Sequence, residues 1–369
     1  MINRFYVNNY RTLENFELPI GGLPSALLVG KNGAGKSNVG FALEILQKVG
    51  RGDNRLKNLL LPRDMSRGQT ETPVRLEIEV DLEGVRFEYF LVLELPEGFR
   101  ELRVLEESLV VGGKPKFIRK VEKVQFPRGD GVSTGNMTFD WHLVWLSVHQ
   151  ANSSDDPVHQ FREWLAKMII LRPYPLHIKG DSTEETLYPN TEVTNLGAWW
   201  SGLIAHSPAV YARIDESLRM MMPDLKDIKN PLVAKDARSL IVQFDTERMP
   251  LSLPFELLSD GEKCMVIWAL TMAANDAYGP LFCFWDEPDN YLAISEIGDF
   301  AIDLRKAFGA KGQFVATSHN AETIRKFSDD NTLVLIRRTH LEPTQIRSLA
   351  SIGYSGDLIN SLITGTLGS

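Results

Sequence analysis

The segment Gly30–Ser37, with the sequence GKNGAGKS, constrains the fold of this chain more than any other feature. It matches the pattern G-x-x-x-x-G-K-[ST] at every fixed position, and the apolar run Ala26–Val29 before it predicts a buried strand. A helical pattern with apolar residues on one face begins at Ser37. Glycines in such a strand–loop–helix unit let backbone N–H groups surround a phosphate at the helix N-terminus. The chain is therefore expected to bind a nucleotide; a plain glycine-rich turn is the disfavoured alternative.

The polar side chains of this phosphate loop (Gly30–Ser37) have separate expected tasks. Lys36 is expected to reach the β- and γ-phosphates and to take part in catalysis, and the Ser37 hydroxyl is expected to bind Mg²⁺. The further positions expected to contact the nucleotide are Asn32, Gly33, Gly35 and Asn38.

Two adjacent acids, Asp286 and Glu287, follow the apolar run Leu281–Trp285, which predicts a second buried strand. Adjacent residues of a strand point to opposite faces, so the two carboxylates are expected to have different tasks. Asp286 is expected to bind Mg²⁺, and Glu287 to act as the general base on an attacking water. In a chain without a phosphate loop, an acidic pair after a strand would often be only the start of a solvated loop. Because this chain also has a phosphate loop, a role of the two acids in a nucleotide site is favoured.

Two further segments have weaker local signals. The segment Leu258–Lys263, LSDGEK, predicts a helix start, because Ser259 is a good N-cap and Glu262 follows three residues later. Nearer the C-terminus, an apolar strand pattern is followed by Ser318 and His319. A capping box and an ordinary polar loop would explain these segments one at a time. Their order along the chain, after the phosphate loop and around the acidic pair, is more specific.

In this order the motifs resemble those of ABC-type ATPase heads, of the SMC-like rather than the transporter group. LSDGEK resembles the signature motif, FWDEP the Walker B motif, and Ser318-His319 the switch histidine. More narrowly, Leu258–Leu270, Phe284–Leu292 and Phe314–Ile324 resemble AAA-type ABC ATPases of OLD-like and bacterial anti-phage defence systems. The resemblance implies a P-loop ATP hydrolase fold.

The resemblance also implies a mechanism in which two copies enclose two ATP molecules with Mg²⁺. Each ATP would contact Lys36 and Ser37 of one copy and Ser259 and Gly261 of the other. His319 would donate to the γ-phosphate and thereby report hydrolysis. The expected assembly is a homodimer that closes on ATP binding and reopens on hydrolysis, or a higher oligomer of such dimers.

The chain departs from the family pattern in two places. The family often has a His-Pro pair shortly after Walker B, where this chain has Asp289–Ile294. A family glutamine usually links the γ-phosphate to the boundary between the lobes. Gln125 and Gln150 are both candidates for that glutamine, and the choice between them stays open.

The long section between the phosphate loop and LSDGEK predicts an α/β fold with two insertions. Its first part alternates apolar and polar residues, which predicts an antiparallel β meander, and its second part has helical periodicity. The predicted parts are an ATPase core (residues 1–72 and 232–369, with strands from 73–126), an antiparallel β lobe (73–150) and a helical insert (151–231). The section lacks the long heptads of an SMC arm, and no acidic TOPRIM-like pattern follows the last predicted strand. A nuclease effector is therefore expected to be a separate protein.

Composition bounds the function classes. Hydrophobic residues make up 43% and charged residues 24% of the 369 residues, as in an ordinary globular protein. No apolar run approaches the ~20 residues that a membrane span needs, and two cysteines are no disulfide framework. We therefore expect a cytoplasmic protein without a membrane partner. The net charge of −8 does not indicate general nucleic-acid binding.

One local charge cluster leaves nucleic-acid binding open. The basic residues of this cluster are Lys114, Lys116, Arg119, Lys120, Lys123 and Arg128. They can follow a phosphate backbone, or they can simply protect an edge strand from aggregation.

The leading functional hypothesis, by family analogy, is an anti-phage defence ATPase that controls a nuclease or toxin partner. The alternatives are an ATP-bound scaffold that sequesters an effector with slow turnover, and a DNA-repair or recombination ATPase that binds DNA directly.

Overall fold

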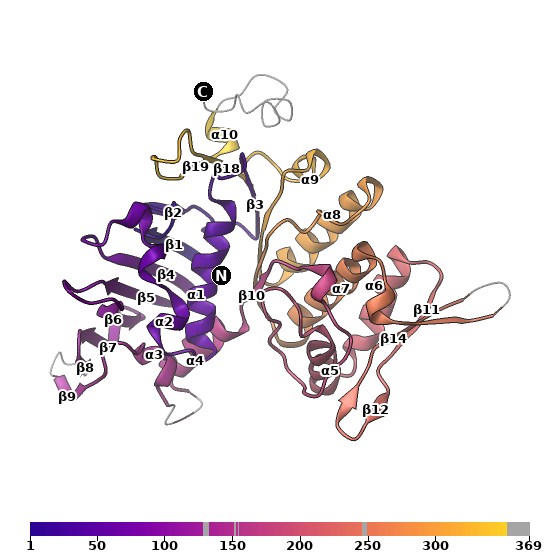
Figure 1. The fold of residues 1–369 in the computed structure, drawn as a ribbon, viewed down its shortest axis with the longest axis horizontal. Coiled ribbons are helices and arrows are strands. Elements are labelled where there is room, and N and C mark those ends of the chain that lie inside the picture. Colours follow the sequence, from indigo (N-terminus) through magenta and orange to yellow (C-terminus); the bar gives the residue numbers. More distant parts are fainter. Residues whose placement is uncertain (128–132, 151–152, 154, 246–248, 353–369) are drawn as a thin grey trace. The chain divides into compact units, whose positions relative to one another are not determined.

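The computed structural model describes residues 1–127, 133–150, 153, 155–245 and 249–352 (Figure 1). The chain forms two compact units, one from Met1–Met168 with the described residues after Ser328, the other from Ile169–Ser328. The three parts expected from the sequence have boundaries that differ from those of these two units, and that division stays a prediction. Within the described residues, no helix combines the length and the apolar character that a membrane crossing requires.

The first unit contains an eight-stranded sheet with the order β2-β1-β4-β5-β6-β7-β8-β9. All its neighbouring strands pair antiparallel, so the expected β meander is present, and the N-terminal strands join it because β1 pairs with β4. The strands are β1 (Ile2–Asn8), β2 (Phe16–Leu18), β4 (Val74–Leu82), β5 (Val85–Glu94), β6 (Arg103–Val111), β7 (Lys114–Lys120), β8 (Lys123–Pro127) and β9 (Ser133–Thr138).

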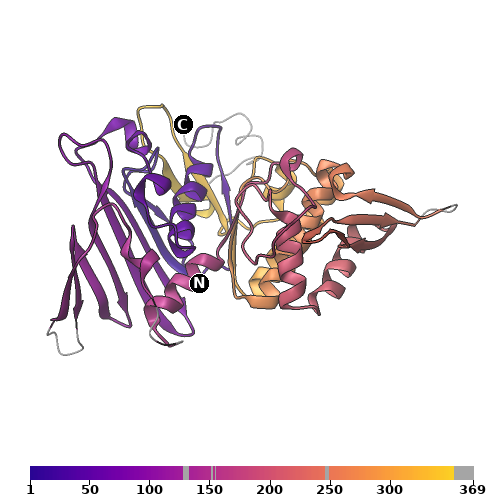
Figure 2. The ribbon, with the colours of Figure 1, turned by 60° about the horizontal axis from the view of Figure 1, so that its bottom comes forward.

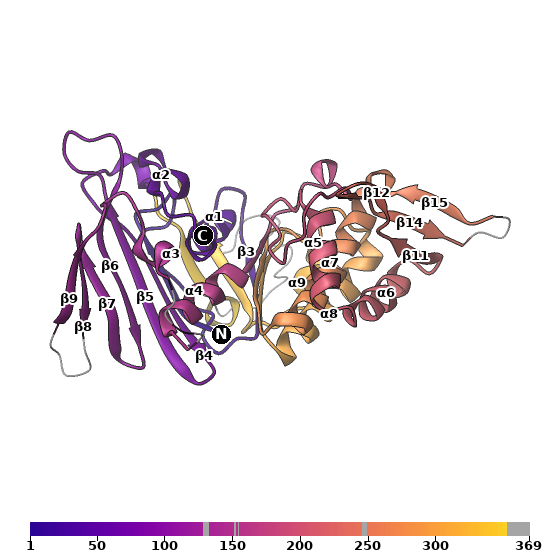
Figure 3. The same cartoon turned by 90° about the horizontal axis from the view of Figure 1, so that it is seen from below.

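Two helices, α1 (Lys36–Gly50) and α4 (Pro157–Lys167), lie together on one face of this sheet (Figures 2 and 3). Phe161 of α4 stacks on Phe87 of β5, with ring centroids 5.9 Å apart. A side chain at Gly50 would collide with the backbone of α4, at 2.5 Å from the Ala166 nitrogen, so glycine permits the close helix contact.

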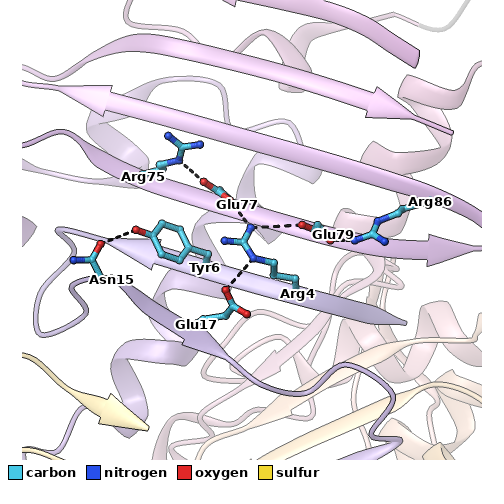
Figure 4. A network of polar contacts seen from close by, with 8 residues as sticks. All are labelled: Arg4, Tyr6, Asn15, Glu17, Arg75, Glu77, Glu79 and Arg86. Atoms are coloured by element: carbon cyan, nitrogen blue, oxygen red, sulfur yellow. Dashed lines mark hydrogen bonds and ion pairs between the residues drawn. The ribbon is translucent and has the colours of Figure 1, made fainter. Parts of the chain in front are cut away.

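The opposite face of the sheet carries a network of ion pairs rather than an apolar layer (Figure 4). Arg4 of β1 lies 2.9 Å from Glu17 and 3.5 Å from Glu79, and also pairs with Glu77. Glu79 in turn pairs with Arg86. Such half-exposed pairs contribute little stability each, and their alternation of sign is typical of a solvated sheet face.

A second group of strands in the first unit contains the strand before the phosphate loop. Strand β18 (Thr332–Ile336) pairs parallel with β3 (Ser25–Val29) and antiparallel with β19 (Gln345–Ser348). All five residues of β3 are buried, as the apolar run predicts. The short helices of this unit are α2 (Leu56–Leu59), α3 (Trp145–Val148) and α10 (Leu349–Ile352).

The basic cluster is interrupted by a buried ion pair. Arg119 and Glu107 face each other across β7 and β6 at 3.3 Å, and both side chains are 0% exposed. The Glu107 carboxylate also accepts hydrogen bonds from Tyr89 and from the backbone N–H groups of Trp145 and Leu146. Burial raises the pKa of Glu107, and the positive charge of Arg119 opposes that shift.

Removal of this carboxylate has a large expected effect on stability. Glu107→Ala leaves the buried Arg119 charge without its counter-ion and the N–H groups of Trp145 and Leu146 without their acceptor. The free energy of unfolding should therefore fall by ~3–5 kcal/mol. Urea denaturation followed by tryptophan fluorescence measures the loss. Glu88→Ala, on the same sheet but 45% exposed, is the control and should change stability by less than about 0.5 kcal/mol. Equal losses in the two variants would contradict a stabilising role of the buried carboxylate.

The second unit contains three parallel strands, β10 (Ile169–Leu171), β16 (Phe282–Trp285) and β17 (Gln313–Thr317), all completely buried. Its helices are α5 (Leu196–His206), α6 (Val210–Met221), α7 (Asp260–Tyr278), α8 (Ile294–Ala310) and α9 (Ala321–Arg325). Its other strands are β11 (Leu225–Lys229), β12 (Leu232–Ala234), β13 (Ala237–Arg238), β14 (Ile241–Phe244) and β15 (Leu251–Pro254). Figure 3 shows α5, α6 and α7 side by side, with the β14–β15 hairpin projecting beyond them.

Candidate functional site

The phosphate loop connects β3 to α1 through three glycines with positive φ. These values are +154° at Gly30, +79° at Gly33 and +103° at Gly35. Gly35 is the N-cap of α1, and no side chain within the described residues caps this end of the helix. No capping side chain therefore competes with an anion for the positive end of this helix, as the motif predicts.

The loop is supported from behind by two threonines that the sequence reasoning did not identify. A Cβ at Gly35 would lie 2.5 Å from Thr344 Oγ1 and 2.7 Å from Thr12 Oγ1. Thr344 Oγ1 lies 2.8 Å from the Ala34 carbonyl and 2.8 Å from Thr12 Oγ1. Asn38 Nδ2, expected to contact nucleotide, donates to Thr12 Oγ1 at 2.8 Å. In the structure, the Asn38 side chain therefore stabilises the phosphate loop through its bond to Thr12.

The Lys36 side chain is buried and folds back over the phosphate loop. Its Nζ donates to the Gly30 carbonyl at 2.9 Å, which places the ammonium group at the loop that would hold a phosphate. Asn32 and Gly33 are exposed at the loop tip, where Arg337 donates to the Gly33 carbonyl at 3.3 Å. Lys36 and the loop backbone therefore present positive charge and N–H donors together.

The acidic loop (Asp286–Asn290) begins where β16 ends, at Trp285. The Asp286 N–H continues the strand ladder and donates to the Leu171 carbonyl at 2.8 Å. Glu287 has a φ of +51°, in the left-handed region. The prediction that the two acids alternate across a strand is therefore wrong, because the chain turns between them instead of remaining extended.

One buried hydroxyl contacts both acids. Thr317 Oγ1 donates to Asp286 Oδ1 at 2.6 Å and accepts the Glu287 N–H at 2.9 Å. Asp286 Oδ2 has no hydrogen-bond partner in the described parts of the chain. A carboxylate with one oxygen fixed and the other not hydrogen-bonded to the described chain is suited to a cation.

The structure brings the predicted general base and the predicted switch histidine together. His319 Nε2 lies 3.2 Å from Glu287 Oε1, and the side chains are 42% and 32% exposed. Asn290 Nδ2 donates to the other carboxylate oxygen of Glu287 at 2.5 Å. Asn290 was not expected at the site; its signal in the sequence is only its place three residues after Glu287.

Buried Asp289 anchors the turn that carries His319. Its Oδ2 accepts from Ser318 Oγ at 2.5 Å and from the hydroxyl of Thr323. Ser318 Oγ also accepts the Asn320 N–H at 2.8 Å. The acidic loop and the histidine turn are thus held as one polar assembly within the second unit.

The predicted capping box is confirmed at the start of α7. Ser259 Oγ accepts the Glu262 N–H at 3.3 Å, and Glu262 accepts the Ser259 N–H at 2.7 Å. Since Ser259 Oγ serves as an acceptor here, its proton remains available for donation. A Cβ at Gly261 would lie 2.9 Å from the Tyr291 carbonyl, so the first turn of α7 packs against the chain after the acidic loop.

The family glutamine is not decided by the structure. Gln150 is exposed shortly after α3, and Gln125 lies on β8 opposite Asn136.

The basic cluster is smaller than its sequence suggests. Arg119 is buried against Glu107, so the alternative in which this side chain follows a phosphate backbone does not hold for it. Lys120 and Lys123 are exposed and paired across the β7–β8 turn. Arg128 lies outside the described residues.

The residues present fit a Mg²⁺ ion that arrives with a nucleotide. Within the described residues, no group of three or more His, Cys, Asp or Glu side chains could hold a metal ion without other ligands. Magnesium in nucleotide sites is bound by one or two side chains together with the phosphates. The Ser37 hydroxyl in the first unit and the Asp286 carboxylate in the second are each an oxygen group of the kind that Mg²⁺ prefers.

Comparison with known proteins supports the fold. The protein-family model "AAA domain, putative AbiEii toxin, Type IV TA system" matches residues 25–181, which include the phosphate loop. The chain is similar to a structure of the Smc head bound to the C-terminal winged-helix domain of ScpA: TM-score 0.58, 14% identity, 95% of this chain and 98% of that chain covered. This chain has the fold of an SMC head.

A second solved structure agrees. It is the Smc head domain with an extended coiled coil, bound to the C-terminal domain of ScpA from Pyrococcus furiosus, with TM-score 0.56 and 12% identity over 95% of this chain and 97% of that chain. No curated protein matches the chain significantly in sequence. The two structural similarities confirm the expected α/β fold of the ABC-type head.

Proposed function

We propose that the chain is a Mg²⁺-dependent ATP hydrolase that acts as a pair of copies. The observation that carries the proposal is the acidic loop, where Thr317 orients Asp286 and the Glu287 carboxylate lies beside His319. The left-handed glycines and uncapped helix start of the phosphate loop support it, as do the SMC-head fold and the match to an AAA family model.

The residues have separate roles in this proposal. The phosphate loop (Asn32, Gly33, Gly35) and Lys36 bind the phosphates. Ser37 and Asp286 hold Mg²⁺, which neutralises phosphate charge during transfer. Glu287 accepts a proton from the attacking water, and His319 donates to the γ-phosphate.

The second copy supplies the signature segment (Leu258–Lys263). The first turn of α7 presents N–H groups and the Ser259 hydroxyl, which are suited to a phosphate group. In this arrangement, Ser259 and Gly261 of one copy face the ATP held by Lys36 of the other. ATP binding closes the pair, and hydrolysis reopens it.

We infer that the output of this cycle is control of a separate effector protein, such as a nuclease or a toxin, in anti-phage defence. The matching family model is described by a toxin of a type IV toxin–antitoxin system, and the similar Smc heads were solved with a bound protein, ScpA. Direct DNA binding has less support, because Arg119 is buried.

A second candidate, an ATP-bound scaffold that sequesters an effector with slow turnover, has one observation in its favour. The Glu287 carboxylate is already engaged by His319 and Asn290, which would restrain it as a base. Release of a bound effector on hydrolysis would favour the controlling ATPase, and retention with very slow hydrolysis would favour the scaffold.

Mixing two inactive variants tests whether two copies share a site. Lys36→Ala removes the phosphate contact, and Ser259→Arg blocks the signature segment. Each variant alone should hydrolyse little ATP. An equal mixture should regain about a quarter of wild-type activity, because half of the randomly formed dimers contain one complete site of two. A mixture no more active than its parts would contradict shared sites; Glu322→Gln mixed with wild type is the control for mixing itself.

A further inference from the structure

Among the described side chains, only Thr317, the last residue of β17, hydrogen-bonds both Asp286, the predicted Mg²⁺ ligand, and Glu287, the predicted general base. Its hydroxyl is 0% exposed and bonds the carboxylate of Asp286 and the N–H of Glu287. We propose that Thr317 is a positioning residue that holds one oxygen of Asp286, so that the other faces Mg²⁺, and that sets the direction of the Glu287 side chain. This inference rests on the ATPase function proposed above.

The two bonds use both capacities of one hydroxyl group. The O–H donates to a carboxylate, and a lone pair accepts an amide N–H, which among similarly sized side chains only serine and threonine can do. A bond to a charged acceptor is stronger than a neutral one, and its 2.6 Å length is typical of that class. Because the hydroxyl is buried, water cannot replace it without rearrangement.

The bond to Asp286 sets which carboxylate oxygen faces a cation. Oδ1 is held by Thr317, so the carboxylate cannot rotate without losing the bond. Residues that orient a metal ligand in this way tune metal affinity strongly. Valine at position 317 would leave Asp286 free to turn.

The bond to Glu287 stabilises an unfavourable backbone conformation. Glutamate rarely adopts a φ of +51°, and such conformations persist only where surrounding contacts enforce them. The left-handed turn directs the Glu287 side chain toward His319. Loss of the Thr317 acceptor would let the peptide relax and would move the carboxylate away from that position.

The other hydroxyls nearby do not duplicate this role. Ser318 and Thr323 both donate to the carboxylate of Asp289, which lies close to the two acids in sequence. Neither hydroxyl bonds Asp286 or Glu287. Thr271 offers a matched control, because it is also 0% exposed but bonds only the Ile267 carbonyl of its own helix.

The test compares Thr317→Val, Thr317→Ser and Thr271→Val in the full chain. A fluorescent ATP analogue is titrated at a series of Mg²⁺ concentrations and in EDTA, and steady-state hydrolysis is measured in parallel. Thr317→Val should raise the Mg²⁺ concentration for half-maximal binding and lower kcat, each by ~10–100-fold. Affinity for the analogue in EDTA should stay within a few-fold, because the phosphate loop is unchanged. Thr317→Ser and Thr271→Val should behave like wild type.

Several results would overturn the proposal. One is an unchanged Mg²⁺ dependence and kcat in a folded Thr317→Val protein. Another is failure of Thr317→Ser to restore both, which would leave only a packing role. If Thr317→Val does not fold, as judged by thermal unfolding, Thr317→Ala is measured instead against the same criteria. A wild type that binds no nucleotide would overturn the proposed ATPase itself. An active wild type whose Mg²⁺ dependence and kcat do not change when Thr317 is replaced would overturn only this inference.

Discussion

Replacement of Glu287 by glutamine is expected to lower ATP turnover by about 10²–10⁴-fold, the range that loss of a general base produces. Glutamine has the same shape but cannot accept the proton of the attacking water at neutral pH. Its side-chain oxygen can still accept the hydrogen bond from Asn290. ATP affinity should therefore stay close to that of wild type, and steady-state phosphate release with a parallel nucleotide titration measures the two quantities separately.

Solution mass gives this prediction a second measurement. If hydrolysis reopens the pair, Glu287→Gln should accumulate a Mg·ATP-dependent species of twice the monomer mass in light scattering. Wild type should show it only transiently. Glu322→Gln is a matched control, since Glu322 is an acid of the same unit that pairs with Arg325 on the surface. Turnover within tenfold of wild type would show that Glu287 is not the base. A mass unaffected by ATP in all proteins would contradict ATP-driven pairing.

The elements that carry the site could be predicted because their signals are local. The buried strand before the phosphate loop, the capping box at Ser259 and the apolar strand before Asp286 all depend on residues within one turn or one strand. Each was expected at nearly its observed place. The Ser259–Glu262 pair, for example, needs no knowledge of the rest of the chain.

The contacts that organise the acidic loop could not be predicted in the same way. Thr317 meets Asp286 only because β16 and β17 are parallel neighbours, although the two residues are about thirty positions apart in sequence. Asp289 and Ser318 are brought together by the same pairing. A polar residue at the end of a strand has no local feature that names its partner across the sheet.

The basic cluster shows the opposite error, where a local pattern suggests too much. Alternation along β7 already places Arg119 on the same face as Phe117, which is the buried face of the sheet. What permits a buried arginine there is Glu107 on the neighbouring strand. A count of basic residues within a short segment could not reveal that pairing. The alternation of side chains along the strand, in contrast, already indicated that Arg119 points to the buried face.

Replacement of Gly35 by alanine is expected to weaken ATP binding by about tenfold or more, since strain of ~1–3 kcal/mol corresponds to that factor, and two causes contribute. A φ of +103° is costly for any residue with a Cβ. The added methyl would also lie 2.5 Å from Thr344 Oγ1 and 2.7 Å from Thr12 Oγ1, which are the hydroxyls that support the loop. Relief of the collision must displace either the loop backbone or these threonines, and both changes move the N–H groups that would hold phosphate.

Gly22 provides the control that separates strain from collision. It has a φ of +77° in the same unit, but a Cβ there would meet nothing within 4 Å. Gly22→Ala should therefore lower stability modestly, by ~1 kcal/mol, and leave ATP affinity unchanged. Calorimetric titration with Mg·ATP, together with thermal unfolding of both variants, makes the comparison. Equal ATP affinity in Gly35→Ala and wild type would mean that nucleotide does not use this loop, because the collision with Thr12 and Thr344 cannot be avoided while the loop keeps its conformation.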